Sequence, residues 1–171
     1  MARFSLTALA LVALLLIISC ASRQLKAPSE PFVYIQVHKI SDVEKEALKE
    51  INKYRRSKGA RPLEVDTQLV VIADWQAEDM AGNNYFSHTD SLGRDPFVRM
   101  GEFGFTYNTW RGENLAAGVS DGKEAFELWR KSPGHNANML NPNFTRIGIS
   151  VVCHDDTTFE CYWASELSGT P

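Results

Sequence analysis

Residues 129–140 read WRKSPGHNANML, and this stretch organises the rest of the chain. Because proline has no amide hydrogen and clashes with the preceding turn, the Pro133-Gly134 pair predicts the end of a helix that carries Trp129. A second short helix is expected after the bend, with apolar residues at Ala137, Met139 and Leu140. The bend therefore places His135 at a defined point, at the start of that second helix.

Two other stretches supply side chains that can share a site with His135. They are Tyr85-Phe86-Ser87-His88 and Gly112-Glu113-Asn114-Leu115. The three stretches provide two imidazoles and one carboxylate, enough for a small metal or acid/base site if the fold brings them together. Other roles stay open, since a loop histidine such as His88 is often only solvated and Glu113 also suits a structural carboxylate at a turn.

The length of 171 residues suits one domain whose core needs no cross-link. Its 18 lysine and arginine residues against 21 acids give a net charge of -3. Removing Arg3 with an N-terminal signal leaves 17 against 21, or -4. Surfaces that bind nucleic acids are basic, so this balance argues against a nucleic-acid partner.

The first 19 residues have the composition of an export signal. Arg3 precedes an almost wholly apolar run at residues 6–19, which is shorter than the roughly 20 residues of a membrane-spanning helix. Ile17-Ile18-Ser19-Cys20 resembles the bacterial lipobox, in which a peptidase cuts before the cysteine and the cysteine then carries lipid. Residues 1–19 are therefore predicted to be a lipoprotein signal peptide, and residues 20–40 the lipidated Cys20 and a proline-containing tether.

Lipidation at Cys20 would make the membrane a partner and leave the domain outside the cytoplasm, anchored to a bacterial cell membrane. The alternative is an uncleaved anchor helix with an incidental cysteine. Either arrangement exports the domain.

Cys153 and Cys161 lie on either side of the polar turn at residues 154–158. A hairpin there would bring them together and allow one disulfide, which suits an oxidising exterior. On the chain-entropy account, a disulfide that closes so short a loop would stabilise the folded protein by about 2–3 kcal/mol. Two free thiols are the alternative, and the spacing disfavours a zinc knuckle.

Two helices are predicted early in the chain. Ser41-Asp42-Val43-Glu44 has the capping-box pattern, and helical spacing of apolar residues continues until Gly59. Asp66 is placed to cap a second helix that ends near Gly82. The expected buried positions are Val43, Ala47, Leu48, Ile51 and Tyr54 in the first helix, and Leu69, Val70, Ile72, Ala73, Ala77, Met80 and Ala81 in the second.

The remaining elements are shorter. Aromatic and β-branched residues predict an edge strand at residues 32–37 and a half-buried strand at residues 105–110. Residues 91–104 are expected to form a loop with one helical turn at residues 97–100, and Asp121 opens the helix of Trp129. Two strands of a hairpin are expected at residues 147–153 and 159–165, so the pattern predicts an α+β layered domain.

Five motifs follow one another in the chain: NYFSH at residues 84–88, GR at 93–94, GENLAAG at 112–118, the stretch at 129–140, and NFTRIGI at 143–149. Their order resembles the CAP superfamily of cysteine-rich secretory, antigen 5 and pathogenesis-related 1 proteins, in its bacterial SCP-domain form. The likeness covers about 125 residues, from near Val43 to near Glu166. It implies an SCP/CAP domain at residues 41–171, folded as a three-layer α-β-α sandwich around a largely antiparallel sheet.

The resemblance also implies a site. It makes His88 and His135 the two site histidines, with Glu113 as the carboxylate between them. Many relatives carry a second glutamate after the tryptophan helix, where this chain has Ser132, and often an arginine where it has Asn136. Two histidines and one glutamate still match a three-ligand zinc or other divalent-metal site with an open position. The missing carboxylate removes a separate general base.

The expected function is that of an extracellular, lipid-anchored SCP-domain protein that is non-enzymatic or at most weakly enzymatic. Its cleft would bind a divalent metal through His88, Glu113 and His135, together with a small ligand such as a lipid or a cell-surface component. The alternative is a metal-dependent hydrolase, a peptidase or an esterase, with Glu113 as base. A structural adhesin with an idle cleft is a third hypothesis. A serine nucleophile at Ser87 or Ser132 is disfavoured because no nucleophile elbow surrounds either.

Overall fold

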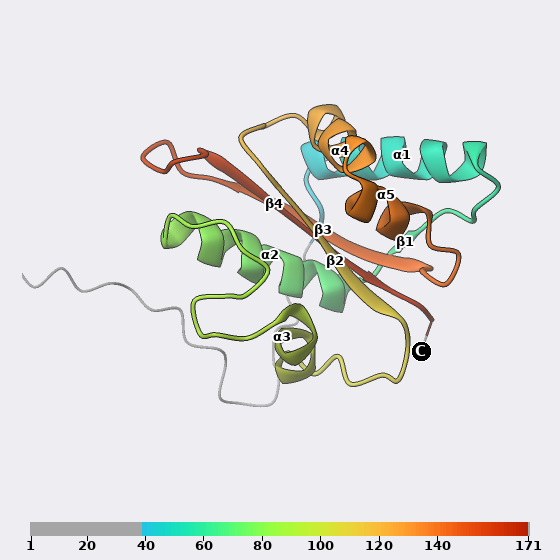
Figure 1. Cartoon of the computed structure of the whole chain (residues 1–171), viewed down its shortest axis with the longest axis horizontal. Helices are drawn as coiled ribbons and strands as arrows, with labels where there is room; N and C mark the ends of the chain where they lie inside the picture. The colour runs from blue at the N-terminus through green and yellow to red at the C-terminus, as the bar shows by residue number, and fades with distance from the viewer. Residues whose placement is uncertain (1–38, 171) are drawn as a thin grey trace, which may run out of the picture.

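The computed structural model describes residues 39–170. The predicted signal peptide, Cys20, nearly all of the tether and the strand predicted at residues 32–37 lie outside this part of the chain. The described elements follow in the order α1 (Asp42–Ser57), β1 (Glu64–Val65), α2 (Thr67–Gly82), α3 (Pro96–Glu102), β2 (Arg111–Ala117), α4 (Gly122–Lys131), α5 (Pro133–Leu140), β3 (Arg146–Cys153) and β4 (Cys161–Ser168) (Figure 1).

The strands form one sheet in the order β1-β3-β4-β2. β4 pairs with β2 and β3 in antiparallel fashion, and the two-residue β1 pairs with β3 in parallel. Helices α1, α4 and α5 cover one face of the sheet, and α2 and α3 cover the other (Figure 1). The α-β-α sandwich is therefore confirmed, with a mixed sheet that is antiparallel except for β1.

Both early helices begin where the sequence predicts. Ser41 and Glu44 form a reciprocal capping box at α1, and the Asp66 carboxylate accepts hydrogen bonds from the first backbone amides of α2. These bonds satisfy amides that have no partner inside a helix. The buried face of α1 differs from the prediction, since Val43 is 37% exposed while Glu44 and Arg55 are buried.

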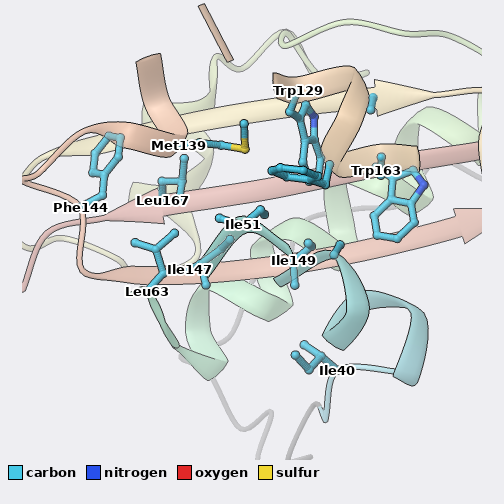
Figure 2. Packing of buried hydrophobic residues seen from close by; sticks show 14 of the residues in the cluster. Ile40, Ile51, Leu63, Trp129, Met139, Phe144, Ile147, Ile149, Trp163 and Leu167 are labelled. Carbon is cyan, nitrogen blue, oxygen red and sulfur yellow. The ribbon is translucent and has the colours of Figure 1, made fainter. Parts of the chain in front are cut away.

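The larger apolar core lies between the sheet and the α1, α4 and α5 layer. The indole rings of Trp129 and Trp163 meet edge to face there, 6.2 Å apart, and neither side chain is exposed. Figure 2 shows these two residues with Ile51, Met139 and Ile147 around them. Since side chains alternate along a strand, Tyr162, Ala164 and Glu166 of β4 face the opposite helical layer.

The bend at Pro133 matches the prediction. Helix α4 ends at Lys131, Ser132 joins the two helices, and Pro133 occupies the first position of α5, where its missing amide hydrogen costs nothing. His135 therefore lies in the first turn of α5. The hairpin is also confirmed, because Cys153 and Cys161 are register partners and form a disulfide; the alternatives of free thiols and a zinc knuckle are wrong.

Two predictions about the segment before β2 are wrong. Residues 105–110 form no strand. The first and last residues of this segment make other backbone hydrogen bonds: the Phe105 amide donates to the Met100 carbonyl, and the Trp110 carbonyl accepts from the Gly169 amide. The strand begins at Arg111, so Glu113 lies in a strand and not in a turn. The helix in the preceding loop is also longer than one turn, because Asp95 and Pro96 start it early.

Among the helices of residues 39–170, none combines the length and the apolar character that a transmembrane span requires.

Candidate functional site

Strand β2 lies at the edge of the sheet and separates the two helical layers at the site. Its odd-numbered residues face α2 and α3, as the packing of Leu115 with α2 residues indicates. Its even-numbered residues face α5, where Asn114 bonds to the backbone of His135. Because no further strand of the described sheet follows β2, residues of both layers reach the same edge.

His88 comes to this edge from the loop after α2. Its Nδ1 atom lies 2.5 Å from Oε1 of Glu113, and 53% of its side chain is exposed. The loop is held by the buried Asp79 carboxylate, which accepts from the Tyr85 hydroxyl at 2.5 Å and from the Ser91 amide at 2.8 Å. The Asp79 contacts therefore fix the backbone that presents His88.

Glu113 is buried and both of its carboxylate oxygens have partners. Oε1 meets His88, and Oε2 pairs with the guanidinium of Arg99 from α3. The Arg99 side chain is fully buried; it also lies 3.4 Å from Glu166 and 3.7 Å from Asp90, and it donates to the His88 carbonyl at 3.3 Å. Arg99 thus ties the two strands and the His88 loop together.

Arg99, Glu166 and Asp90 are site residues that the sequence analysis missed. The available signal was modest. Glu166 is a lone acid within an otherwise uncharged strand, and Asp90 and Arg99 belong to a stretch of sequence rich in charge. Neither pattern by itself distinguishes a buried ion pair from a solvated one.

The two carboxyls share a single buried cation. Burial raises the pKa of Glu113 to about 7, against the opposing effect of Arg99. Burial also raises the pKa of Glu166 well above its ordinary value, and the neighbouring Glu113 raises it further. Within the described residues, Oε2 of Glu166 is buried and accepts or donates no hydrogen bond. One of the two carboxyls therefore holds a proton near neutral pH.

His135 approaches the edge of β2 from the other layer. Its carbonyl accepts a 3.1 Å hydrogen bond from Asn114, while Asn138 donates to the Glu113 carbonyl at 3.2 Å and to Asn114 at 2.9 Å. These bonds fix the first turns of α5 against the strand. Burial lowers the pKa of the His135 imidazole, and the charge of His88 lowers it further.

Burial lowers the pKa of His88 as well. Both imidazoles are therefore predominantly neutral at pH 7, the form in which a ring nitrogen can accept a proton or a metal ion.

Metal binding by His88, Glu113 and His135 together stays a prediction. No group of three or more His, Cys, Asp and Glu side chains in the described part of the chain is arranged to hold a metal ion. The physical reason is that Glu113 is already bonded through both oxygens, to His88 and to Arg99. The donors that remain are the two imidazoles, and Glu113 is placed to orient His88 as metal-bound histidines are oriented elsewhere.

The fold and the site define a class: a small α-β-α sandwich with two histidines held at the open edge of its sheet. The profile of CAP, the cysteine-rich secretory protein family, matches residues 48–166. The chain belongs to this family.

Two curated relatives come from Bacillus subtilis. The uncharacterized protein YkwD is 39% identical over 113 residues, which cover 66% of this chain and 44% of the relative. The uncharacterized membrane protein YlbC is 36% identical over 108 residues, covering 63% and 31%. The chain thus spans less than half the length of each relative.

Solved structures agree on the fold. An extracellular SCP-domain protein of Bacillus anthracis superposes with a TM-score of 0.66 at 26% identity, covering 83% of this chain and 45% of that one. An outer surface protein of Borrelia burgdorferi gives a TM-score of 0.67 at 22% identity, covering 77% and 97%.

Proposed function

We propose that this chain is an exported CAP domain that binds a ligand where His88 and His135 meet at the edge of β2. The observation that carries the proposal is the double engagement of Glu113 by His88 and Arg99. A carboxylate held in this way orients an imidazole and is not free to act as an independent base. Such a site is built for recognition more than for turnover.

In this proposal the Nδ1–H of His88 donates to Glu113, so the lone pair of Nε2 points away from the carboxylate. His135 supplies a second imidazole from the other layer. Two neutral imidazoles suit a divalent metal such as zinc, with open positions for a ligand. The metal would supply a charge for an anionic group of that ligand, and the ligand class proposed is a small amphipathic molecule such as a lipid or another component of the cell surface.

The proposed location is the outer side of a bacterial membrane, where Cys20 carries the lipid anchor. Support comes from the signal-like first 19 residues and from the Cys153–Cys161 disulfide, a bond typical of oxidising compartments. The extracellular SCP-domain protein of Bacillus anthracis is a relative of matching fold. Mass spectrometry of the membrane fraction tests this part, since an unmodified Cys20 still joined to Ser19 would contradict it.

A metal-dependent hydrolase, a peptidase or an esterase, is the second candidate. One observation favours it: burial raises the pKa of Glu113 to about 7, a suitable value for an acid/base group at neutral pH. In this case the two histidines would hold the metal and Glu113 would move the proton. Turnover of a peptide or ester substrate that is lost in both His88→Ala and His135→Ala would support it.

Calorimetric titration of the purified protein with zinc at pH 7.5 tests the binding proposal. We expect one zinc ion per chain, and loss of that binding in His88→Ala and in His135→Ala. His154→Ala is the matched control, because His154 lies in the β3–β4 turn and takes no part in the site. No zinc uptake by the wild type, or uptake unchanged in both site variants, would contradict the metal part of the proposal.

A further inference from the structure

A hollow lies beside α3, apart from the residues of the histidine site. It has a volume of about 530 Å³ and is lined by Phe97, Asn108, Thr109, Trp110 and Arg111, a set called the aromatic groove below. Phe97 belongs to the first turn of α3, and the other four residues form the approach to β2 and its first residue (Figure 1). The volume is within the range of small-molecule sites.

The aromatic side chains of the groove are unusually open to solvent. Trp110 is 61% exposed and Phe97 is 50% exposed. Burying a large aromatic ring against a partner releases substantial free energy, so two exposed rings lining one hollow mark a surface suited to binding.

The backbone that presents Trp110 is firmly held. The Trp110 carbonyl accepts from the Gly169 amide at 2.9 Å, and the Thr109 hydroxyl donates to the Thr170 carbonyl at 3.1 Å. A Cβ atom at Gly169 would overlap the Thr109 hydroxyl, so the two segments are in close contact. The exposed ring is therefore carried on a fixed support, which lowers the entropy lost on binding.

The groove also contains an available cation. The guanidinium of Arg111 lies 5.9 Å from the centre of the Phe97 ring. Within residues 39–170, its side chain forms no ion pair and no hydrogen bond, whereas Arg94 and Arg99 are each paired with carboxylates. An unpaired guanidinium over an aromatic ring is complementary to a carboxylate or phosphate on a ligand that stacks on the ring.

We propose that the aromatic groove binds an acidic sugar, with a sugar ring stacked on Trp110 and its carboxylate paired with Arg111. The Asn108 amide and the Thr109 hydroxyl supply hydrogen-bonding groups for the sugar hydroxyls. A purely apolar chain would leave these polar groups and the guanidinium without partners when bound.

The test is calorimetric titration of the purified full-length protein with trigalacturonate, an acidic trisaccharide, and with the neutral trisaccharide maltotriose. Saturable binding of trigalacturonate is expected, with maltotriose at least tenfold weaker. Arg111→Met and Trp110→Ala should each weaken trigalacturonate binding at least tenfold. Phe97→Ala serves as the second aromatic variant if Trp110→Ala fails to fold.

Matched controls lie on α4, on the opposite face of the sheet. Arg130→Met removes an exposed arginine and Leu128→Ala removes a 41% exposed apolar side chain; neither should change the affinity. His88→Ala should also leave it unchanged, so the groove is tested separately from the histidine site.

Three results would overturn the proposal. The first is no saturable binding of trigalacturonate. The second is equal affinity for the two trisaccharides, unaltered in Arg111→Met. The third is binding only to phosphatidylglycerol vesicles, lost in Trp110→Ala, which would make the groove a membrane contact instead.

Discussion

Glu113 of β2 and Glu166 of β4 are register partners, and both side chains pair with the guanidinium of Arg99. Side chains opposite each other on neighbouring strands are only about 5 Å apart at their Cβ atoms. Two ionised carboxylates at that spacing would repel each other strongly in a buried setting. Arg99 and one retained proton together make the arrangement possible, and the histidine site depends on it because Glu113 orients His88.

Removing the shared cation should be costly. In Arg99→Met both carboxyls lose their buried ionic partner, and we expect a loss of about 3–5 kcal/mol in the free energy of unfolding. Urea denaturation followed by circular dichroism measures it. Arg130→Met, which breaks an exposed and solvent-screened pair, should change stability very little. Similar effects of the two substitutions would contradict the role given to Arg99.

The carboxyl pair should make stability depend on pH in a defined direction. The pKa values of Glu113 and Glu166 are raised in the folded protein, so the folded state binds protons that the unfolded state releases. Their contribution is complete below about pH 4.5 and declines as the pH rises, and the part due to Glu113 is lost by about pH 7. The pKa values of His88 and His135 are lowered in the folded protein, so their effect on stability has the opposite sign: the free energy of unfolding falls as the pH drops below about 6.5.

A substitution at Glu166 separates the contribution of the carboxyl pair to stability from that of the histidines. In Glu166→Gln the second carboxyl can no longer ionise, so the decline between about pH 4.5 and 7 should be reduced while the histidine contribution remains. The measurement is the free energy of unfolding of both proteins at half-unit intervals of pH. Parallel pH profiles would show that Glu166 is already ionised at low pH and would refute the shared proton.

Gly148 of β3 packs directly against helix α2, and no larger residue should be tolerated at this position. A Cβ atom on Gly148 would overlap the backbone of Leu69 and Val70, and backbone atoms of a packed helix cannot move aside cheaply. Gly148→Ala should therefore destabilise the protein by about 3 kcal/mol or more, at the upper end of overpacking effects. Gly101→Ala in α3 has open space and should be neutral or stabilising by up to about 1 kcal/mol. Thermal denaturation compares them, and equal melting temperatures would contradict the close contact.

The Cys153–Cys161 disulfide should stabilise the hairpin modestly. Its sequence separation is 8 residues, so the chain-entropy account assigns it about 2–3 kcal/mol. Reduction with dithiothreitol should lower the stability of the wild type by that amount and leave the Cys153→Ser, Cys161→Ser double variant unchanged. A wild type insensitive to the reductant would contradict this contribution.

Local sequence signals predicted the parts of the fold that depend on local chemistry. Ser41, Asp66 and Asp121 each begin a helix because their side chains accept orphan amides, and Pro133 separates α4 from α5 as expected. The prediction of a strand at residues 105–110 was wrong. It was made because aromatic and polar residues alternate there as they do in a half-buried strand. The real strand begins at Arg111, where no such alternation stands out.

Buried charge is what sequence patterns could not reveal. Arg55 looks like an ordinary basic residue in the last turn of a helix, yet it is fully buried and donates to the carbonyls of Arg61, Met139 and Phe144. Arg99 and Glu166 were missed for the same reason. Their partners lie far away in sequence, so no local spacing marks them, whereas His88, Glu113 and His135 stand within distinctive motifs.

The central claim is that His88 and His135 converge at the edge of β2, with Glu113 as the group that orients His88 and not as a ligand. The most direct test is two-dimensional ¹H–¹⁵N NMR of the histidine side chains during zinc titration at pH 7.5. The account predicts that the Nε2 signals of His88 and His135 shift together and saturate at one equivalent, while the Nδ1–H signal of His88 persists. A shift of only one histidine, or loss of that Nδ1–H signal on binding, would contradict it.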